Sequence, residues 1–186
     1  MNQLKNSYLH GHPVVSRIHP MVTKIDSLFQ SLSNAPKDIT ALVAHWEGLR
    51  RGRRYPARRD IVPVALRDYL GLLCIIEVRN DPVDFVYRLF GSTMAGHMSM
   101  DLTGKSILEL QPAELGQLLF TQVADTITAG APEYFRTLVS YGVPPRHSGS
   151  HRLILPLWDD DVRIDHILTY TRIDLDAPDF WSRILR

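Results

Sequence analysis

The stretch LLCIIEVRNDPVDFVYRLFG, residues 72–91, has the pattern of two strands joined by a tight turn. Its first part is apolar and rich in β-branched residues, and its last part again consists mainly of strand-forming side chains. Asn80, Asp81 and Pro82 lie between the two parts, and all three residue types favour a turn. The stretch therefore predicts a β-hairpin, and with it an antiparallel sheet.

The sequence after the hairpin predicts helices followed by three more strands. Residues 112–130 carry apolar side chains at helical spacing, which indicates a long amphipathic helix. Strand-like segments follow at 132–140, 150–158 and 163–173, and the polar links between them favour an antiparallel meander. Two strands, a group of helices and three further strands predict an α+β fold, because strict alternation of strand and helix would be typical of a parallel sheet.

The sequence before the hairpin predicts further helices. Residues 38–51 place apolar side chains, Trp46 among them, on one helical face, and Asp38 suits the N-cap. A second short helix is expected between Pro63 and Gly71, since proline favours a helix start and glycine a helix end.

These segments divide the chain into four expected parts. They are an N-terminal arm (1–37), the leading helices with an arginine-rich joint (38–70), the sheet core (71–175) and a C-terminal tail (176–186). Within the arm, apolar side chains at helical spacing in residues 23–32 predict a short docking helix.

Composition indicates an ordinary globular protein. The chain has 186 residues, of which 45% are hydrophobic and 22% charged, and its formal net charge is only +1. Its one cysteine, Cys74, excludes an intramolecular disulfide and any cysteine-based metal cluster. No apolar run approaches the roughly 20 residues of a membrane-spanning helix, and the N-terminus lacks an export signal. We therefore expect a cytoplasmic protein.

Four motifs carry a resemblance to a known family: HWEGLRRGRRYPARRDIVP (45–63), FVYRLFGSTM (85–94), DLTG (101–104) and LILPLW (153–158). With its leading pattern W-x-x-L-R-x-G-R-x-x-P-x-R, the chain resembles a bacterial family of short, stand-alone PAS-type proteins. The residues that match are Trp46, Pro56, Arg58, Arg88, Gly91, Thr93, Asp101, Thr103 and Gly104. The resemblance implies a PAS-like five-stranded antiparallel sheet with helices on one face, preceded by N-terminal helices, and a pocket for a small molecule.

The arginine-rich joint has two interpretations. Its arginines are Arg50, Arg51, Arg53, Arg54, Arg58 and Arg59. They either hold phosphate or a partner's acidic surface, or line a solvated connection in which some pair with Glu47, Asp60 or Asp68. Because helices that precede PAS cores often pack as dimer interfaces, and a tryptophan suits an interface anchor, we place Trp46 with the arginines on a candidate partner or dimer surface. Nucleic acid is not expected there, since no helix-turn-helix pattern or aromatic-interleaved basic surface accompanies the cluster.

The implied pocket has six candidate lining residues: Arg88, His97, Tyr134, Trp158, His166 and Tyr170. Arg88 lies within a strand, so it is either an anion-binding group of the pocket or half of an ion pair with Asp101 or Glu77. Alternation puts His166 and Tyr170 on one side of the last strand, and either side of that strand can face the helices.

Catalysis and metal binding find little support in the sequence. It contains none of the nucleotide-binding, hydrolase or metalloprotease motifs, and the apolar surroundings of Cys74 predict a buried thiol. PAS photoreceptors that bind flavin covalently use a cysteine just after the second strand, and residues 92–100 contain none. His10 and His12 lack an evident third metal ligand, and the acidic run 159–161 suits a solvated turn. We therefore predict no catalytic residue and no metal site, and no cofactor is indicated.

The leading hypothesis is a non-catalytic PAS-like sensory or adaptor module in bacterial signalling, which couples a small-molecule or cytoplasmic signal to a protein partner. We expect a signalling protein partner and a homodimer, leave a small-molecule ligand open, and expect no membrane insertion. Two alternatives remain: a small enzyme with His97 or His166 as general base, and a nucleic-acid adaptor that binds through the arginines at 50–59.

Overall fold

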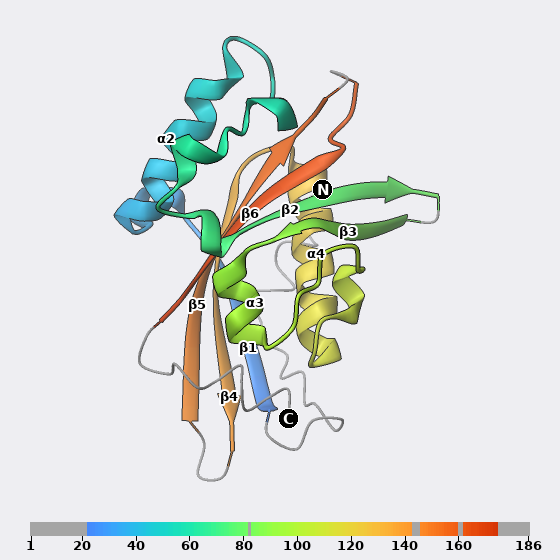
Figure 1. The fold of residues 1–186 in the computed structure, drawn as a ribbon. Coiled ribbons are helices and arrows are strands. Elements are labelled where there is room, and N and C mark those ends of the chain that lie inside the picture. The colour runs from blue at the N-terminus through green and yellow to red at the C-terminus, as the bar shows by residue number, and fades with distance from the viewer. Residues whose placement is uncertain (1–21, 82, 143–145, 160–161, 175–186) are drawn as a thin grey trace.

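The computed structural model describes residues 22–81, 83–142, 146–159 and 162–174 (Figure 1). Most of the expected N-terminal arm, with His10 and His12, lies outside the described residues, as do the expected C-terminal tail and part of the acidic run. No helix in the described ranges is long and apolar enough to cross a bilayer.

The described chain forms one six-stranded antiparallel sheet in the order β1-β4-β5-β6-β2-β3. The strands are β1 (Val22–Gln30), β2 (Leu73–Asn80), β3 (Val83–Phe90), β4 (Glu133–Tyr141), β5 (Arg146–Leu157) and β6 (His166–Ile173). Strands β2 and β3 form the predicted hairpin, and β4, β5 and β6 form the predicted meander. The expected α+β fold with an antiparallel sheet is confirmed.

The prediction of a helix over residues 23–32 is wrong, because this segment is the edge strand β1. It pairs along its length with β4, which supplies the backbone hydrogen bonds that a helix would have provided internally. Ile25 is buried in the core, and Phe29 packs edge-to-face on Phe135 of β4 with ring centroids 5.9 Å apart. Tertiary pairing thus overrides the helical spacing of the apolar residues and adds a sixth strand to the expected five.

The helices are α2 (Lys37–Arg50), α3 (Ser92–Met98) and α4 (Ala113–Ala129), and the short 3-10 turns are η1 (Leu32–Asn34), η2 (Arg58–Asp60), η3 (Pro63–Leu66), η4 (Leu70–Leu72) and η5 (Ile107–Glu109). The predicted helices at 38–51 and 112–130 are therefore confirmed. The helix expected between Pro63 and Gly71 is instead the pair of 3-10 turns η3 and η4.

Helical elements lie on both faces of the sheet, whereas the sequence predicted helices on one face (Figure 1). One apolar core joins α3, η5 and α4 to the sheet and includes Met94, Leu119 and Ile76. A second core on the opposite face joins α2 and the turns that follow it, and includes Trp46 and Leu155. The leading helix is therefore a layer of the domain itself.

The pairing of β6 decides which of its side chains face each helical layer. Ile167 belongs to the core under α3 and α4, and Thr169 and Thr171 line a hollow in the same layer. Leu168 and Tyr170 belong to the core under α2. Tyr170 therefore points away from the helices that were expected to enclose a pocket.

The helix α2 begins one residue earlier than expected, so Asp38 lies in its first turn and is not its N-cap. The Asp38 carboxylate instead accepts a hydrogen bond from the Tyr170 hydroxyl at 2.8 Å and pairs with Arg172 Nη1 at 2.9 Å. This contact ties the start of α2 to β6.

Candidate functional site

A small hollow lies inside the core between the sheet and the helices α3 and α4. Its volume is about 20 Å³, and the residues that line it include Cys74, Tyr87, Met94, Arg152 and Thr171. This volume is roughly that needed by one water molecule. Arg152 is the charged side chain among the residues that line it.

Arg152 is buried, with only 5% of the residue exposed. Its Nε donates to Thr171 Oγ1 at 3.3 Å, and its Nη1 donates to Gln122 Oε1 at 3.0 Å. Gln122 in turn donates from Nε2 to Ser27 Oγ at 2.9 Å, which connects α4 to β1. Sequence reasoning missed Arg152, although alternation along β5 places it on the face of the buried Ile154.

Cys74 and Tyr87, which line the hollow with Arg152, are neutral near pH 7. Burial raises the pKa of the Cys74 thiol to about 11, and burial also raises the pKa of Tyr87. The thiol is therefore not available as a nucleophile near neutral pH, as its apolar surroundings in the sequence predicted.

The six predicted pocket residues do not meet in this hollow. Tyr134 and Tyr170 belong to the core on the opposite face, and Trp158 packs beside that core, edge-to-face on Tyr55 at 4.8 Å. His166 lies at the start of β6, where its Nδ1 is 2.8 Å from Asp165 Oδ1. Sequence alternation does not say which face of a strand each helix covers, so these residues could not be assigned to one layer from the sequence.

Arg88 and His97 take separate places. Arg88 is half exposed on β3 and its Nε lies 3.6 Å from Glu77 Oε2, which agrees with the ion-pair interpretation. His97 lines a recess of about 510 Å³ at the end of β6 together with Thr93, Tyr170 and Arg172. Of the six residues, His97 and Tyr170 are the pair that shares a cavity within the described chain.

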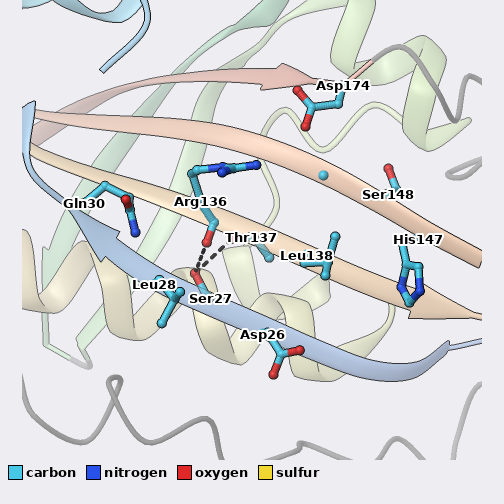
Figure 2. A pocket seen from close by; sticks show the side chains of 11 residues that line it. Asp26, Ser27, Leu28, Gln30, Arg136, Thr137, Leu138, His147, Ser148 and Asp174 are labelled. Atoms are coloured by element: carbon cyan, nitrogen blue, oxygen red, sulfur yellow. Dashed lines mark hydrogen bonds between the residues drawn. The ribbon is translucent and has the colours of Figure 1, made fainter. Parts of the chain in front are cut away.

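A broad trough of about 520 Å³ lies on the face that α2 covers elsewhere (Figure 2). Leu28 and Asp26 from β1 stand opposite Arg136 and Leu138 from β4. Leu28 and Leu138 are 43% and 42% exposed, and charged groups of both signs surround them. The trough is thus an open, mixed surface at the β1 edge of the sheet.

His151 connects the second core to the rim of this trough. Its Nδ1 lies 2.5 Å from the Tyr134 hydroxyl, and its Nε2 lies 3.4 Å from Asp174 Oδ1. A neutral imidazole with its proton on Nε2 satisfies both contacts, because Tyr134 then donates to Nδ1. Desolvation, reinforced by the charge of Arg172, lowers the pKa of His151 although Asp174 opposes the shift.

We expect stability to fall with acidification because of His151. The unfolded chain binds a proton at this imidazole more readily than the folded chain does. The contribution of neutral His151 to the unfolding free energy is therefore complete above the ordinary pKa of about 6.5 and is lost as the pH falls below it. Chemical unfolding between about pH 7 and pH 5 should therefore show a smaller loss in a His151→Gln variant than in the wild type. The difference in slope is limited to about 1.4 kcal/mol per pH unit for one proton. The same dependence of unfolding free energy on pH in the variant and the wild type would contradict the role of His151.

The arginine-rich joint forms local ion pairs. Arg50 Nη1 lies 2.7 Å from Glu47 Oε2, and Arg53 pairs with Asp60. These contacts agree with the interpretation of a solvated connection for two of its arginines. The joint's exposed arginines are Arg51, Arg54, Arg58 and Arg59.

Trp46 does not belong to the joint's surface. It is 2% exposed, and its Nε1 donates to the Pro156 carbonyl at 2.9 Å. The placement of Trp46 on a partner surface is therefore corrected, because its ring is buried within the chain's own second core.

The described residues contain no group of three or more His, Cys, Asp or Glu side chains arranged to hold a metal ion.

Comparison with known proteins gives one family match. A family model described as a PAS domain matches residues 35–161. No curated protein sequence matches the chain.

Two solved structures are among those to which the chain is similar. A sensory box sensor histidine kinase from Vibrio cholerae is 20% identical, with 60% of this chain and 88% of that chain covered and a TM-score of 0.41. A light-oxygen-voltage domain studied with a flavin analogue is 13% identical, with 66% and 89% covered and a TM-score of 0.44. At these values neither similarity bears on ligand or partner.

Proposed function

Since the chain belongs to the PAS domain family, whose model matches residues 35–161, we propose that it is a non-catalytic sensory or adaptor module in bacterial signalling. In this proposal a small molecule bound in the core is the signal, and a protein partner receives it. The observation that carries the proposal is the hollow at Arg152. There a buried charge faces a space between the sheet and the helical elements α3, η5 and α4. Core positions are ordinarily filled and apolar, so a charged hollow there supports a binding role.

A non-catalytic role is supported by the separation of the reactive side chains. His97 lines the recess at one end of β6, and His166 lies at the other end of that strand beside Asp165. Neither histidine lines the hollow at Arg152, so a small enzyme with either one as general base would have to use another cavity.

The exposed arginines of the joint support a partner with an acidic surface. Arg58 and Arg59 flank the contact between η2 and Asp159, where the Arg58 backbone N–H donates to Asp159 Oδ1 at 2.9 Å. Both side chains are exposed, and although Arg59 Nη1 donates to the Asp159 carbonyl at 3.5 Å, their remaining N–H donors can meet carboxylates of another protein. We place the partner surface at these arginines, and we expect the module to act as a homodimer in the cytoplasm.

Native mass spectrometry of the protein isolated from cells that produce it naturally tests the proposal. We expect a homodimer mass, an added protein partner and a small molecule released on denaturation. An Arg58→Ala/Arg59→Ala variant should lose the partner mass, whereas an Arg67→Ala/Lys105→Ala variant, which removes two exposed charges elsewhere, should keep it. A bare chain without partner or small molecule in repeated preparations would refute the proposed function.

A further inference from the structure

Among the described residues Arg152 forms no ion pair, although the carboxylate of Glu133 is buried on the neighbouring strand β4, where it accepts a hydrogen bond from Thr126. The two hydrogen bonds of Arg152 go to neutral acceptors, Thr171 Oγ1 and Gln122 Oε1. The other charged or titratable groups that act on it are Cys74 and Tyr87, and both stay neutral near pH 7. Within the described chain, no carboxylate forms an ion pair with this guanidinium.

A buried guanidinium without an anion is unfavourable. Arginine does not release its proton at any ordinary pH, so burial cannot be relieved by neutralisation as it can for lysine. Removing a charge from water is costly unless a partner of opposite charge replaces the lost hydration. Two neutral acceptors satisfy only part of the five N–H donors that a guanidinium carries.

The walls of the hollow separate into a polar and an apolar part. The polar part includes Thr171, whose hydroxyl accepts from Arg152, and Thr169, and the apolar part includes Met94, Met98 and Leu119. Methionine side chains are unbranched and adapt readily to a new neighbour. A carboxylate bound at the polar end would pair with the guanidinium, and a short carbon chain would displace the two methionines.

We propose that Arg152 anchors a small organic monocarboxylate with a short apolar tail in this hollow. The inference rests on the proposed sensory function, because the carboxylate is then the signal molecule. The guanidinium and the Thr171 hydroxyl bind the carboxylate oxygens, and the methionines of α3 close over the tail. Neutral molecules of the same shape leave the charge of Arg152 uncompensated and bind more weakly.

Thermal unfolding and calorimetric titration of the full chain test the ligand class. The ligands are acetate, propionate, butyrate and valerate, each compared with its neutral amide and with sodium chloride at equal ionic strength. We expect a saturable rise in Tm for at least one carboxylate. The amide of the same length should bind at least roughly tenfold more weakly than that carboxylate. Equal responses to acid and amide, an equal response to chloride, or no response to any of the four acids would overturn the proposal.

Three variants identify the residue. Arg152→Gln removes the charge but retains a side-chain N–H donor, and its carboxylate affinity should fall roughly tenfold or more. Arg152→Lys should retain part of the response, and Arg136→Gln, an exposed arginine in the trough, should retain all of it. An unchanged affinity in Arg152→Gln would overturn the assignment. The comparison of acids with amides in the wild type decides the ligand class even if a variant does not fold.

This test separates the two proposals. A neutral compound released in the native mass spectrum would overturn the carboxylate site and leave the sensory function standing. Carboxylate binding by a chain that meets no partner would support the site and refute the adaptor function.

Discussion

A Trp46→Ala variant is expected to lose about 3–5 kcal/mol of unfolding free energy, as is usual when a large aromatic side chain is removed from a core. Trp46 is the main aromatic contact between α2 and the sheet: its ring packs near Tyr55 with centroids 6.5 Å apart, and its Nε1 donates to the Pro156 carbonyl. Truncation leaves a cavity and also leaves that carbonyl without a donor. Urea unfolding followed by circular dichroism measures the loss.

A Trp46→Phe variant separates packing from hydrogen bonding at this position. It keeps most of the apolar volume and loses only the indole N–H, so we expect a cost of about 1–3 kcal/mol for the unsatisfied carbonyl. Val64→Ala serves as a control in the same layer, because its side chain is 75% exposed and should change stability by less than about 0.5 kcal/mol. A Trp46→Ala cost as small as that of the control would mean that α2 does not stabilise the domain.

A Gly91→Ala variant is expected to destabilise the chain by about 3 kcal/mol or more, at or above the upper end of the usual cost of overpacking. Gly91 follows β3 and precedes α3, and a Cβ placed there would lie 2.4 Å from the Gly71 carbonyl oxygen and 2.7 Å from that of Leu73. Both contacts are with backbone, which cannot rotate away as a flexible side chain can. Equilibrium unfolding in urea quantifies the effect.

Gly96→Ala is the matched control for this substitution. Gly96 lies inside α3, and a Cβ there would have no heavy atom within 4 Å. Because alanine is the better helix former, we expect stabilisation by about 0.5–1 kcal/mol. The two glycines are five positions apart. Opposite signs of the change in unfolding free energy would attribute the loss at Gly91 to the close approach of the backbone, and equal signs would disprove this explanation.

The sequence was sufficient for those elements whose local pattern and tertiary role agree. The hairpin at 72–91 combines strand-forming residues with a turn, and the helix at 112–130 has one apolar face that the sheet buries. The segment 23–32 has helical spacing and yet forms β1, because an open edge of β4 offers hydrogen bonds to any extended chain. That edge is created by residues more than a hundred positions away, so no local window contains the information.

The candidate site was harder to predict for a related reason. Tyr134 and Tyr170 were expected in the pocket because they lie on strands that would surround a PAS-type cavity. Their side of the sheet is fixed by pairing and by α2, which covers the face that was expected to lack a helical layer. Arg152 could have been found by the argument applied to Arg88, since both are arginines within apolar strands. Arg88 lies on the edge strand β3 and is half exposed, whereas Arg152 lies on the central strand β5 and is buried.

The hydrogen bonds that begin at Arg152 have a direction. A guanidinium can only donate, so Gln122 must accept with its carbonyl oxygen and donate with its amide nitrogen to Ser27. The Ser27 hydroxyl, having accepted, turns its own proton toward Thr137 Oγ1 at 2.9 Å or the Arg136 carbonyl at 3.4 Å, at the margin of the trough (Figure 2). The charge of Arg152 thus fixes which group donates and which accepts in each hydrogen bond from Arg152 through Gln122 to Ser27. A neutral side chain that can both donate and accept in its place would allow the opposite direction as well.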